Sequence, residues 1–280
     1  MSYRASVLIS LCNRPDYLRE LLEYFCGQSF DMRRVEMILV DDSGPENYHN
    51  QQSVIEAARG KCPFMMKYFT TGLPADVYGN TAARNIGLKN ASAPIIICTD
   101  DDCLPHFNMI EEHVNLHENR PRIMVAGVRV KDIAKLSQPL PVEVDDEKSR
   151  RFLAKQENGE LGAGSFFGAN ISVLKRDLEW VGGWNEKMVR PLECGFTDRE
   201  LGMRLMGHGL KFIITPNAII YHRPTEESVK EFRAATGSVE RARRRFKRIQ
   251  RIYKAKRILS APLRLVPGIG PALVRNILRP

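Results

Sequence analysis

The chain has 280 residues, of which 43% are hydrophobic and 27% are charged, as is usual for a globular protein. This length accommodates one large α/β domain with an appendage, or two small domains. No run of eighteen apolar residues occurs, which excludes a conventional membrane-spanning helix, and the amino terminus has no signal-peptide core.

The net charge of +9 is concentrated in the last fifth of the sequence. Residues 224–280 contain 15 Lys and Arg against 4 Asp and Glu, whereas residues 1–223 contain 27 against 29. We therefore expect a near-neutral folded domain over 1–223 and a basic extension over 224–280. The six cysteines include no Cys-x-x-Cys pair, so we expect reduced, mostly buried thiols in a cytoplasmic protein.

Strands and helices are expected to alternate along the first hundred residues, because short apolar runs follow segments with helical spacing. This alternation implies right-handed crossovers and a largely parallel sheet flanked by helices. The expected strands are 5–11, 36–40, 65–69 and 94–99, and the expected helices are 16–25, 51–59 and 80–88.

The second half of the chain has a less regular pattern. A polar, charged stretch over 137–160 predicts a mobile loop region, and residues 162–174 are rich in glycine before becoming strand-like. The other expected elements are helices at 106–118 and 198–207 and strands at 122–130, 210–214 and 217–221.

Three consecutive aspartates, Asp100, Asp101 and Asp102, follow the buried strand 94–99. Crowded carboxylates either raise one another's pKa or hold a cation, and oxygen ligands suit Mg²⁺ or Mn²⁺. A solvated acidic turn is the alternative for an isolated triplet. Because ligands bind at the carboxyl ends of parallel strands, Asp42, at the end of strand 36–40, is expected at the same edge.

Between about Ser6 and His222 the sequence resembles glycosyltransferase family 2 of the GT-A fold. The resemblance rests on several short motifs that occur in the order and approximate spacing of the family. They are Val7–Ser10, Asn13–Pro15, Ile38–Gly44, Ala83–Leu88, Thr99–Asp102, Gly182–Glu186, Thr197–Leu201 and Tyr221–His222.

This resemblance implies an inverting, metal-dependent transferase that uses a nucleotide-diphosphate sugar, with a uridine diphosphate sugar as the expected donor. It implies that Asp42, Arg84, Asp100 and Asp101 bind the donor. It also implies that Asp102 and His222 bind Mn²⁺ or Mg²⁺, although three adjacent aspartates leave open which carboxylate contacts the ion. A metal there would neutralise the charge that grows on the departing diphosphate.

The resemblance also places the catalytic base at Asp198. The family has a Glu-Asp pair at this point, and Thr197 replaces its Glu here. Glu193 is a second candidate for the base. An inverting transfer needs one carboxylate to accept the proton of the attacking hydroxyl. The alternative for Asp198 is an acidic residue that only stabilises a helix amino terminus. Trp184 could stack on a sugar or lie in the core.

Two other functions compete with glycosyl transfer, namely sugar-nucleotide nucleotidyl transfer and a non-catalytic membrane adaptor. Nucleotidyl transfer normally needs a Gly-rich basic loop after the first strand, and residues 10–15 do not supply one. His113 and His117 are four residues apart, as in zinc sites, but no third ligand follows, and a solvated helix face is the preferred interpretation.

The extension contains apolar residues at helical spacing among many Lys and Arg over 238–259. A basic amphipathic helix of this kind favours an anionic membrane surface, which would place the protein peripherally on the cytoplasmic membrane face. Packing of this helix on the catalytic domain is an alternative. Nucleic acid is not expected as a partner, because no known nucleic-acid module accompanies the extension. The expected acceptor is a glycan or a lipid-linked molecule.

Overall fold

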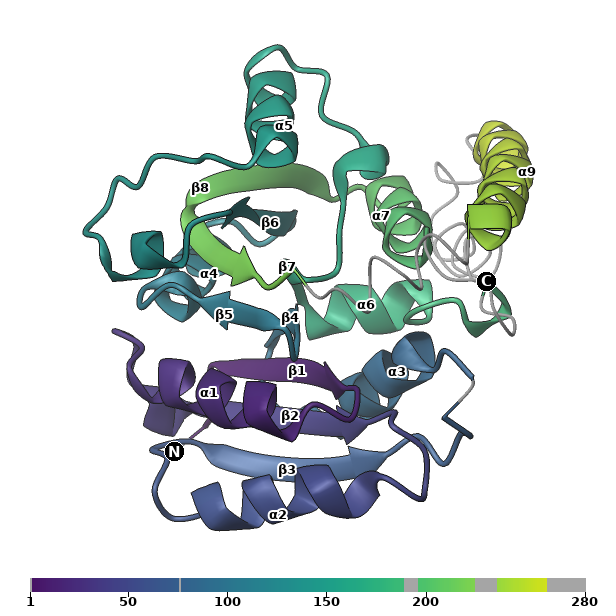
Figure 1. Ribbon diagram of the computed structural model, residues 1–280. Coiled ribbons are helices and arrows are strands. Elements are labelled where there is room, and N and C mark those ends of the chain that lie inside the picture. Colours follow the sequence, from purple (N-terminus) through teal and green to yellow (C-terminus); the bar gives the residue numbers. More distant parts are fainter. Residues whose placement is uncertain (1, 76, 189–195, 225–235, 261–280) are drawn as a thin grey trace.

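The computed structural model describes residues 2–75, 77–188, 196–224 and 236–260 of the chain (Figure 1). The first four strands run parallel to one another in the order β3-β2-β1-β4. Every residue of β1 and β2 is buried, in agreement with their mostly apolar sequences. These strands are β1 (Ala5–Leu11), β2 (Val35–Asp41), β3 (Met65–Thr70) and β4 (Ile95–Asp100).

Three helices connect these strands, as the sequence predicts. Helix α1 begins at Pro15 rather than at Asp16, because proline has no N–H to leave unsatisfied in the first turn. Helices α1 and α2 lie side by side in front of the strands in Figure 1. The bounds are α1 (Pro15–Cys26), α2 (Tyr48–Ala58) and α3 (Asn80–Asn90).

The second half adds four strands, so that the sheet has eight in the order β3-β2-β1-β4-β7-β6-β8-β5. Pairs β4–β7, β6–β7 and β5–β8 are antiparallel, whereas β6–β8 is parallel. The expected strands at 210–214 and 217–221 are one strand, with a register shift opposite Ala126–Val128. The bounds are β5 (Cys103–Pro105), β6 (Ile123–Val130), β7 (Asn170–Leu174) and β8 (Lys211–His222).

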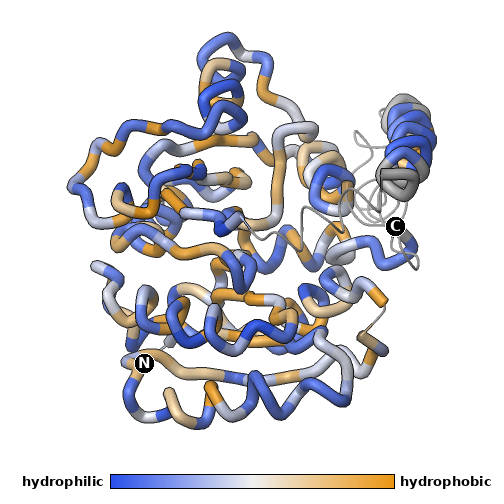
Figure 2. The backbone as a smooth tube through the Cα atoms, in the orientation of Figure 1, coloured by the Kyte–Doolittle hydropathy of each residue, from blue (hydrophilic) through white to orange (hydrophobic). Residues whose placement is uncertain are grey.

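The predicted mixed α/β architecture with a mainly parallel sheet is confirmed, and the strands contribute many of the buried core residues. Hydrophobic residues recur along these strands in Figure 2. The remaining helices surround the second half and the carboxyl end. They are α4 (Met109–Asn119), α5 (Glu147–Glu157), α6 (Lys175–Val181), α7 (Thr197–Gly207) and α9 (Thr236–Ser260). Short 3-10 turns occur at Met32–Arg34, Ile133–Ser137, Ala163–Ser165 and Glu186–Met188.

The prediction of a mobile loop over 137–160 is wrong for its second half, which forms α5. The Asp146 carboxylate caps this helix by accepting a hydrogen bond from the backbone N–H of Ser149. Phe152 and Leu153 are partly buried against the main core. A short helix with a strongly polar sequence gives little periodic signal, so its cap is the feature that could have predicted it.

The prediction of mostly buried thiols holds only in part. Cys98 and Cys103 are buried, whereas Cys12 and Cys26 are exposed and Cys62 is intermediate. No disulfide joins any of these five within the described part of the chain, and Cys194 lies outside it.

Helix α9 forms within the predicted basic extension and packs near α7 through part of its apolar side. The Phe246 ring stacks on Phe196, with 5.2 Å between their centroids. The Tyr253 hydroxyl donates a hydrogen bond to Glu200. Ile249 packs in a small hydrophobic cluster around the Tyr253 ring. The basic side chains described on α9 are mostly exposed, and the helix is mainly hydrophilic in Figure 2.

A search for membrane spans among the described helices finds none with the length and apolar character needed to cross a bilayer.

Candidate active site

The carboxyl ends of β2 and β4 bring several predicted site residues to one edge of the sheet. Asp42 directly follows β2, and Asp100 is the last residue of β4. The short β5 then pairs antiparallel with the end of β8, so that Cys103 is opposite His222. This pairing joins two segments that are far apart in the sequence.

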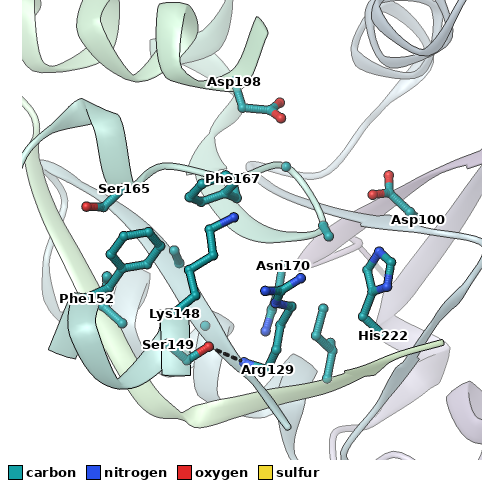
Figure 3. Close-up of a pocket in the computed structure, with 16 residues that line it drawn as sticks. Asp100, Arg129, Lys148, Ser149, Phe152, Ser165, Phe167, Asn170, Asp198 and His222 are labelled. Atoms are coloured by element: carbon teal, nitrogen blue, oxygen red, sulfur yellow. Dashed lines mark hydrogen bonds between the residues drawn. The ribbon is translucent and has the colours of Figure 1, made fainter. Parts of the chain in front are cut away.

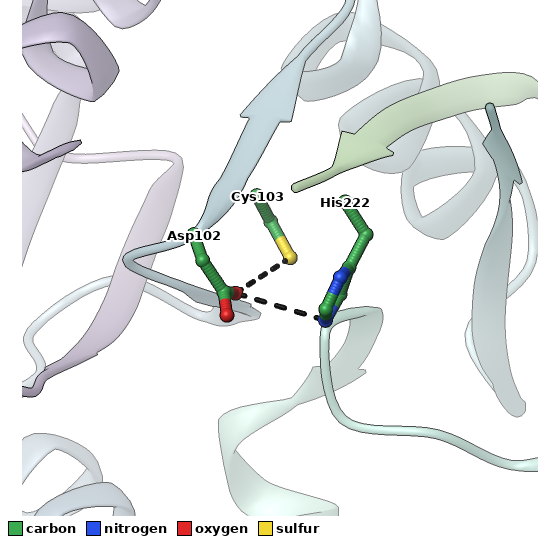
Figure 4. Close-up of side chains that lie close together, drawn as sticks. All are labelled: Asp102, Cys103 and His222. Carbon is green, nitrogen blue, oxygen red and sulfur yellow. Dashed lines mark hydrogen bonds and ion pairs between the residues drawn. The ribbon is translucent and has the colours of Figure 1, made fainter. Parts of the chain in front are cut away.

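Asp102 and His222 lie close together at this edge (Figure 4). The His222 Nε2 atom is 3.7 Å from Asp102 Oδ1, and the Cys103 thiol lies 3.4 Å from the same oxygen. Burial and the neighbouring carboxylates hold the pKa of Cys103 well above its ordinary value, so the thiol stays neutral. A carboxylate and an imidazole, without a thiolate, fit Mn²⁺ or Mg²⁺ better than a soft metal.

These three residues form a group of potential metal ligands within 4.8 Å of one another, and the described residues contain no other such group. The His222 side chain is 34% exposed and the Asp102 side chain 11%, so a bound ion would remain open to a ligand on one side. The residues present therefore fit a divalent cation that protein, substrate and water would complete.

Asp101 is directed away from this group and towards the loop after β1. It is buried, and its carboxylate accepts hydrogen bonds from the Cys12 backbone N–H at 2.7 Å and from Arg14 at 3.1 Å. Burial raises the pKa of Asp101 to about 7, although the Arg14 charge opposes this shift. The Arg14 guanidinium also lies 2.9 Å from Asp102, so it fixes two carboxylates of the triplet.

Asp42 is half-buried at the neighbouring strand end. Its carboxylate accepts hydrogen bonds from the Thr71 hydroxyl at 2.9 Å and from the Gly79 backbone N–H at 2.7 Å. Only glycine fits at 79, because a Cβ there would lie 2.0 Å from Asp42 Oδ1. Burial raises the pKa of Asp42 to about 6, and the adjacent Asp41 adds to this shift while the two hydrogen bonds oppose it.

Arg84 lies between two carboxylates from different elements. Its guanidinium is 4% exposed and donates hydrogen bonds to Asp100, at 2.9 Å, and to Asp198. Burial alone lowers the pKa of Arg84, but the charges of Asp198 and Asp100 raise it above its ordinary value. The chain at Gly168 passes so close that a Cβ there would lie 2.2 Å from Arg84 Nη1.

Asp198 is at the start of α7 and lines a cavity of about 220 Å³ with Asp100 and His222 (Figure 3). The indole N–H of Trp184 also reaches Asp198, at 3.4 Å. Trp184 is 2% exposed, so of the two roles predicted for it the core role describes its position. The reserve candidate Glu193 lies outside the described residues.

The expected solvated face at His113 and His117 is wrong, because both rings are buried against β7. The Ser172 hydroxyl lies between them, 2.7 Å from His113 Nδ1 and 2.8 Å from His117 Nε2, and His113 Nε2 contacts Asn170. Burial lowers the pKa of each histidine to about 4, so both are neutral. The polar residues of β7 were the sequence signal for this network.

Sequence reasoning missed an ion pair that supports α7 from inside the protein. Glu200 and Arg204 are both fully buried and lie 2.7 Å apart. Arg204 also donates hydrogen bonds to the carbonyl oxygens of Val181 and Gly183. The spacing of four residues on one helix was a signal for the pair, but a sequence does not show whether such a pair is buried.

The profile of the family described as Glycosyl transferase family 2 matches residues 6–183. The uncharacterized glycosyltransferase YfnE of Bacillus subtilis (strain 168) is 25% identical, in a match covering 81% of this chain and 66% of the relative. The glycosyltransferase AglE of Haloferax volcanii is 23% identical, in a match covering 39% of this chain and 34% of AglE. The chain therefore spans less than two thirds of the length of either relative.

Solved structures of low sequence identity share the fold. The S. aureus protein TarS (residues 1–349, in complex with UDP-GlcNAc) matches with a TM-score of 0.59 at 15% identity, covering 98% of this chain and 70% of TarS. The mannosyltransferase PcManGT from Pyrobaculum calidifontis, in complex with GDP-Man and Mn²⁺, matches with a TM-score of 0.57 at 14% identity, covering 99% of this chain and 85% of PcManGT.

The family assignment rests on the profile match. The profile alone covers more than half of the sequence. The chain belongs to glycosyl transferase family 2 and has the GT-A fold.

Proposed function

We propose that this enzyme transfers a sugar from a uridine diphosphate sugar to a hydroxyl group of a glycan or lipid-linked acceptor, with inversion at the anomeric carbon. The observation that carries the proposal is the convergence of Asp102, His222, Asp100 and Asp198 at one edge of the sheet. A divalent cation, Mn²⁺ or Mg²⁺, would be held by Asp102 and His222. When bound, it supplies positive charge to the leaving diphosphate.

In this proposal Asp198 is the general base. The acceptor oxygen attacks the anomeric carbon, the bond from that carbon to the diphosphate oxygen breaks, and the hydroxyl proton passes to the Asp198 carboxylate. Asp198 lines the cavity and retains 22% of its side-chain exposure, so it is accessible to an acceptor. Its contact with Arg84 would hold the carboxylate in a fixed orientation at the cavity.

The donor is proposed to bind along the strand ends, with Asp42, Asp100 and Asp101 on the nucleotide side. Arg84 was expected to contact the donor, but its guanidinium is buried between two carboxylates. We therefore assign Arg84 a positioning role, in which it orients Asp100 and Asp198. The UDP-GlcNAc and GDP-Man complexes of the two structural neighbours support a nucleotide-sugar donor.

We further propose that residues 1–223 form the catalytic domain and that 224–280 associate with an anionic membrane surface. The packing of Phe246 and Tyr253 on the domain leaves the basic side chains of α9 for that surface. This arrangement would place the protein peripherally on the cytoplasmic membrane face.

Calorimetry of UDP-GlcNAc and UDP-glucose with the full chain tests the donor and metal assignments together. Binding is expected with Mn²⁺ and is expected to disappear with a chelator and in Asp102→Asn. The control Asp16→Asn changes a side chain that is 86% exposed and should bind as the unmodified chain does. If neither these two donors nor any nucleotide sugar of a wider donor screen binds with Mn²⁺ or Mg²⁺, the proposal is wrong.

A further inference from the structure

The cavity beside Asp198 has a strongly basic wall, which the reaction described above does not use. Asp100, Asp198 and His222 lie at one end, and Arg129 and Lys148 project into it from β6 and α5 (Figure 3). Its volume of about 220 Å³ is below the ~300–1,000 Å³ of a complete ligand site. The cavity therefore suits one part of a larger substrate.

Lys148 is the cation of this wall that most clearly lacks a carboxylate partner. Its ammonium lies 3.4 Å from the centre of the Phe167 ring, and among the described residues no ion pair joins it to a carboxylate. Burial and the charges of Arg129, Arg199 and Arg151 together lower the pKa of Lys148 to about 8, against the attraction of Asp146. A half-buried lysine among three arginines is electrostatically unfavourable unless an anion joins them.

Arg199 extends the basic wall towards the proposed base. It follows Asp198 in sequence, and its guanidinium lies 5.0 Å from the Phe167 ring and 4.9 Å from the Phe196 ring. Burial and the neighbouring charge of Arg243, on α9, lower the pKa of Arg199. Arg199 of α7 thus lies on the same Phe167 ring as Lys148, next to the cavity that Lys148 and Arg129 line.

Of Lys148, Arg129 and Arg199, only Arg129 has a carboxylate partner among the described ion pairs. That contact with Asp146 is long, at 3.4 Å. Phe152 and Phe167, which stack with 5.5 Å between their centroids, also line the cavity. The cavity therefore combines an aromatic surface, on which a sugar ring can pack, with an excess of positive charge.

We infer that the acceptor is a phosphate-bearing molecule whose phosphate binds to Lys148, Arg129 and Arg199, so that its hydroxyl faces Asp198. This inference rests on the proposed function in treating the bound molecule as the acceptor. Guanidinium groups match phosphate oxygens in pairs, and lysine is a common phosphate ligand. Lys148 and Arg199 have no carboxylate partner among the described ion pairs. A phosphate monoester carries up to two negative charges and can neutralise both cations, whereas a single carboxylate can neutralise only one.

Ligand-observed NMR titration of the full chain tests the phosphate site with defined probes. Glucose 6-phosphate is expected to bind at least tenfold more tightly than methyl glucoside, and more tightly than glucuronic acid or inorganic phosphate. Lys148→Met is expected to weaken glucose 6-phosphate binding about tenfold. Arg150→Met removes the same charge from an exposed position on the same helix and should bind like the unmodified chain.

Lys148→Arg keeps the charge and is expected to retain most of the binding, which separates charge from a folding defect. Equal binding of the phosphate and the neutral glycoside would overturn the inference, as would tighter binding of glucuronic acid. Inorganic phosphate binding as tightly as glucose 6-phosphate would indicate a simple anion site and would also overturn it.

The failure of this inference and that of the proposed function give different results. Mn²⁺-dependent binding of UDP-GlcNAc or UDP-glucose should be unchanged in Lys148→Met. If Lys148→Met weakens nucleotide-sugar binding by the same factor, the basic wall serves the donor and the inference is wrong. If the chain binds glucose 6-phosphate through Lys148 but binds no nucleotide sugar, the phosphate site stands and the proposed function fails.

Discussion

Arg84 donates a hydrogen bond to Asp198 from a guanidinium that is almost completely buried. The two residues are 114 positions apart in the sequence, and Asp100 occupies the other side of the same guanidinium. A buried cation between two partly exposed carboxylates holds both at a fixed orientation. The position of the proposed base therefore depends on a residue that need not touch the substrate.

Arg84→Met is expected to lower kcat by about 10²-fold, because small displacements of a catalytic group have effects of this size. KM for the donor should change much less than kcat. The loss of the cation also leaves two carboxylates close together, which should lower the free energy of unfolding by about 2 kcal/mol, since both retain some solvent exposure. Steady-state kinetics and urea unfolding measure the two effects.

The double variant Arg84→Met/Asp198→Asn provides the control for this positioning role. If Arg84 acts through Asp198, the double variant should be little slower than Asp198→Asn alone. Multiplicative losses would instead indicate that Arg84 also acts apart from Asp198, either on the donor directly or through Asp100.

Asp198→Asn is expected to lower kcat by about 10² to 10⁴-fold, which is the usual contribution of a general base. Asparagine has nearly the same size but cannot accept the proton. Mn²⁺-dependent donor binding should persist, because the substitution does not change the proposed metal and nucleotide contacts. Release of nucleotide diphosphate measures turnover, and activity retained within threefold would rule out Asp198 as the base.

The first half of the fold could be predicted because its signals are local. Strands such as β1 and β4 are mostly apolar, and the alternation of strands and helices restricts the order of a parallel sheet. The common edge of Asp42 and Asp100 follows from that order. The contact between Asp102 and His222 needed the family resemblance, because the pairing of β5 with β8 has no local signal.

The burial of His113 and His117 shows where local reasoning fails. Helical spacing puts both on one face of α4, but it does not show what covers that face. In the structure Ser172 and Asn170 of β7 cover it and satisfy the rings by hydrogen bonds. The contacts of Arg14 with Asp101 and Asp102 could not be predicted for the same reason, since both partners are more than eighty residues away in the sequence.

Glu200→Gln is expected to reduce stability more than activity. Glu200 and Arg204 are fully buried, so removal of one charge leaves the other uncompensated, at a cost of about 3–5 kcal/mol. Urea unfolding of Glu200→Gln, compared with the exposed control Glu157→Gln, measures this cost. The double variant Glu200→Gln/Arg204→Met should recover part of the loss. A loss below about 1 kcal/mol would mean that water relieves the unpaired charge.

Asp42 makes stability depend on pH between about 4 and 6. Its pKa is about 6 in the folded protein against an ordinary 3.8, so the folded state binds more protons in this range. Stability should therefore fall as the pH rises from 4 to 6. In Asp42→Asn this contribution disappears, while the neighbouring Asp41 still titrates. Urea unfolding of both proteins at several pH values measures the difference, and parallel pH profiles would contradict the assigned shift.

The basic side of α9 is expected to bind anionic lipid without help from its packed apolar residues. Lys247 and Arg251 are exposed, and each cation near a charged surface contributes about 1 kcal/mol. Lys247→Gln/Arg251→Gln should therefore weaken co-sedimentation with phosphatidylserine-containing vesicles roughly 30-fold. Tyr253→Phe removes the hydrogen bond to Glu200 but no charge, so it should sediment normally. Equal sedimentation of the full chain with neutral and anionic vesicles would show that the basic side has another partner.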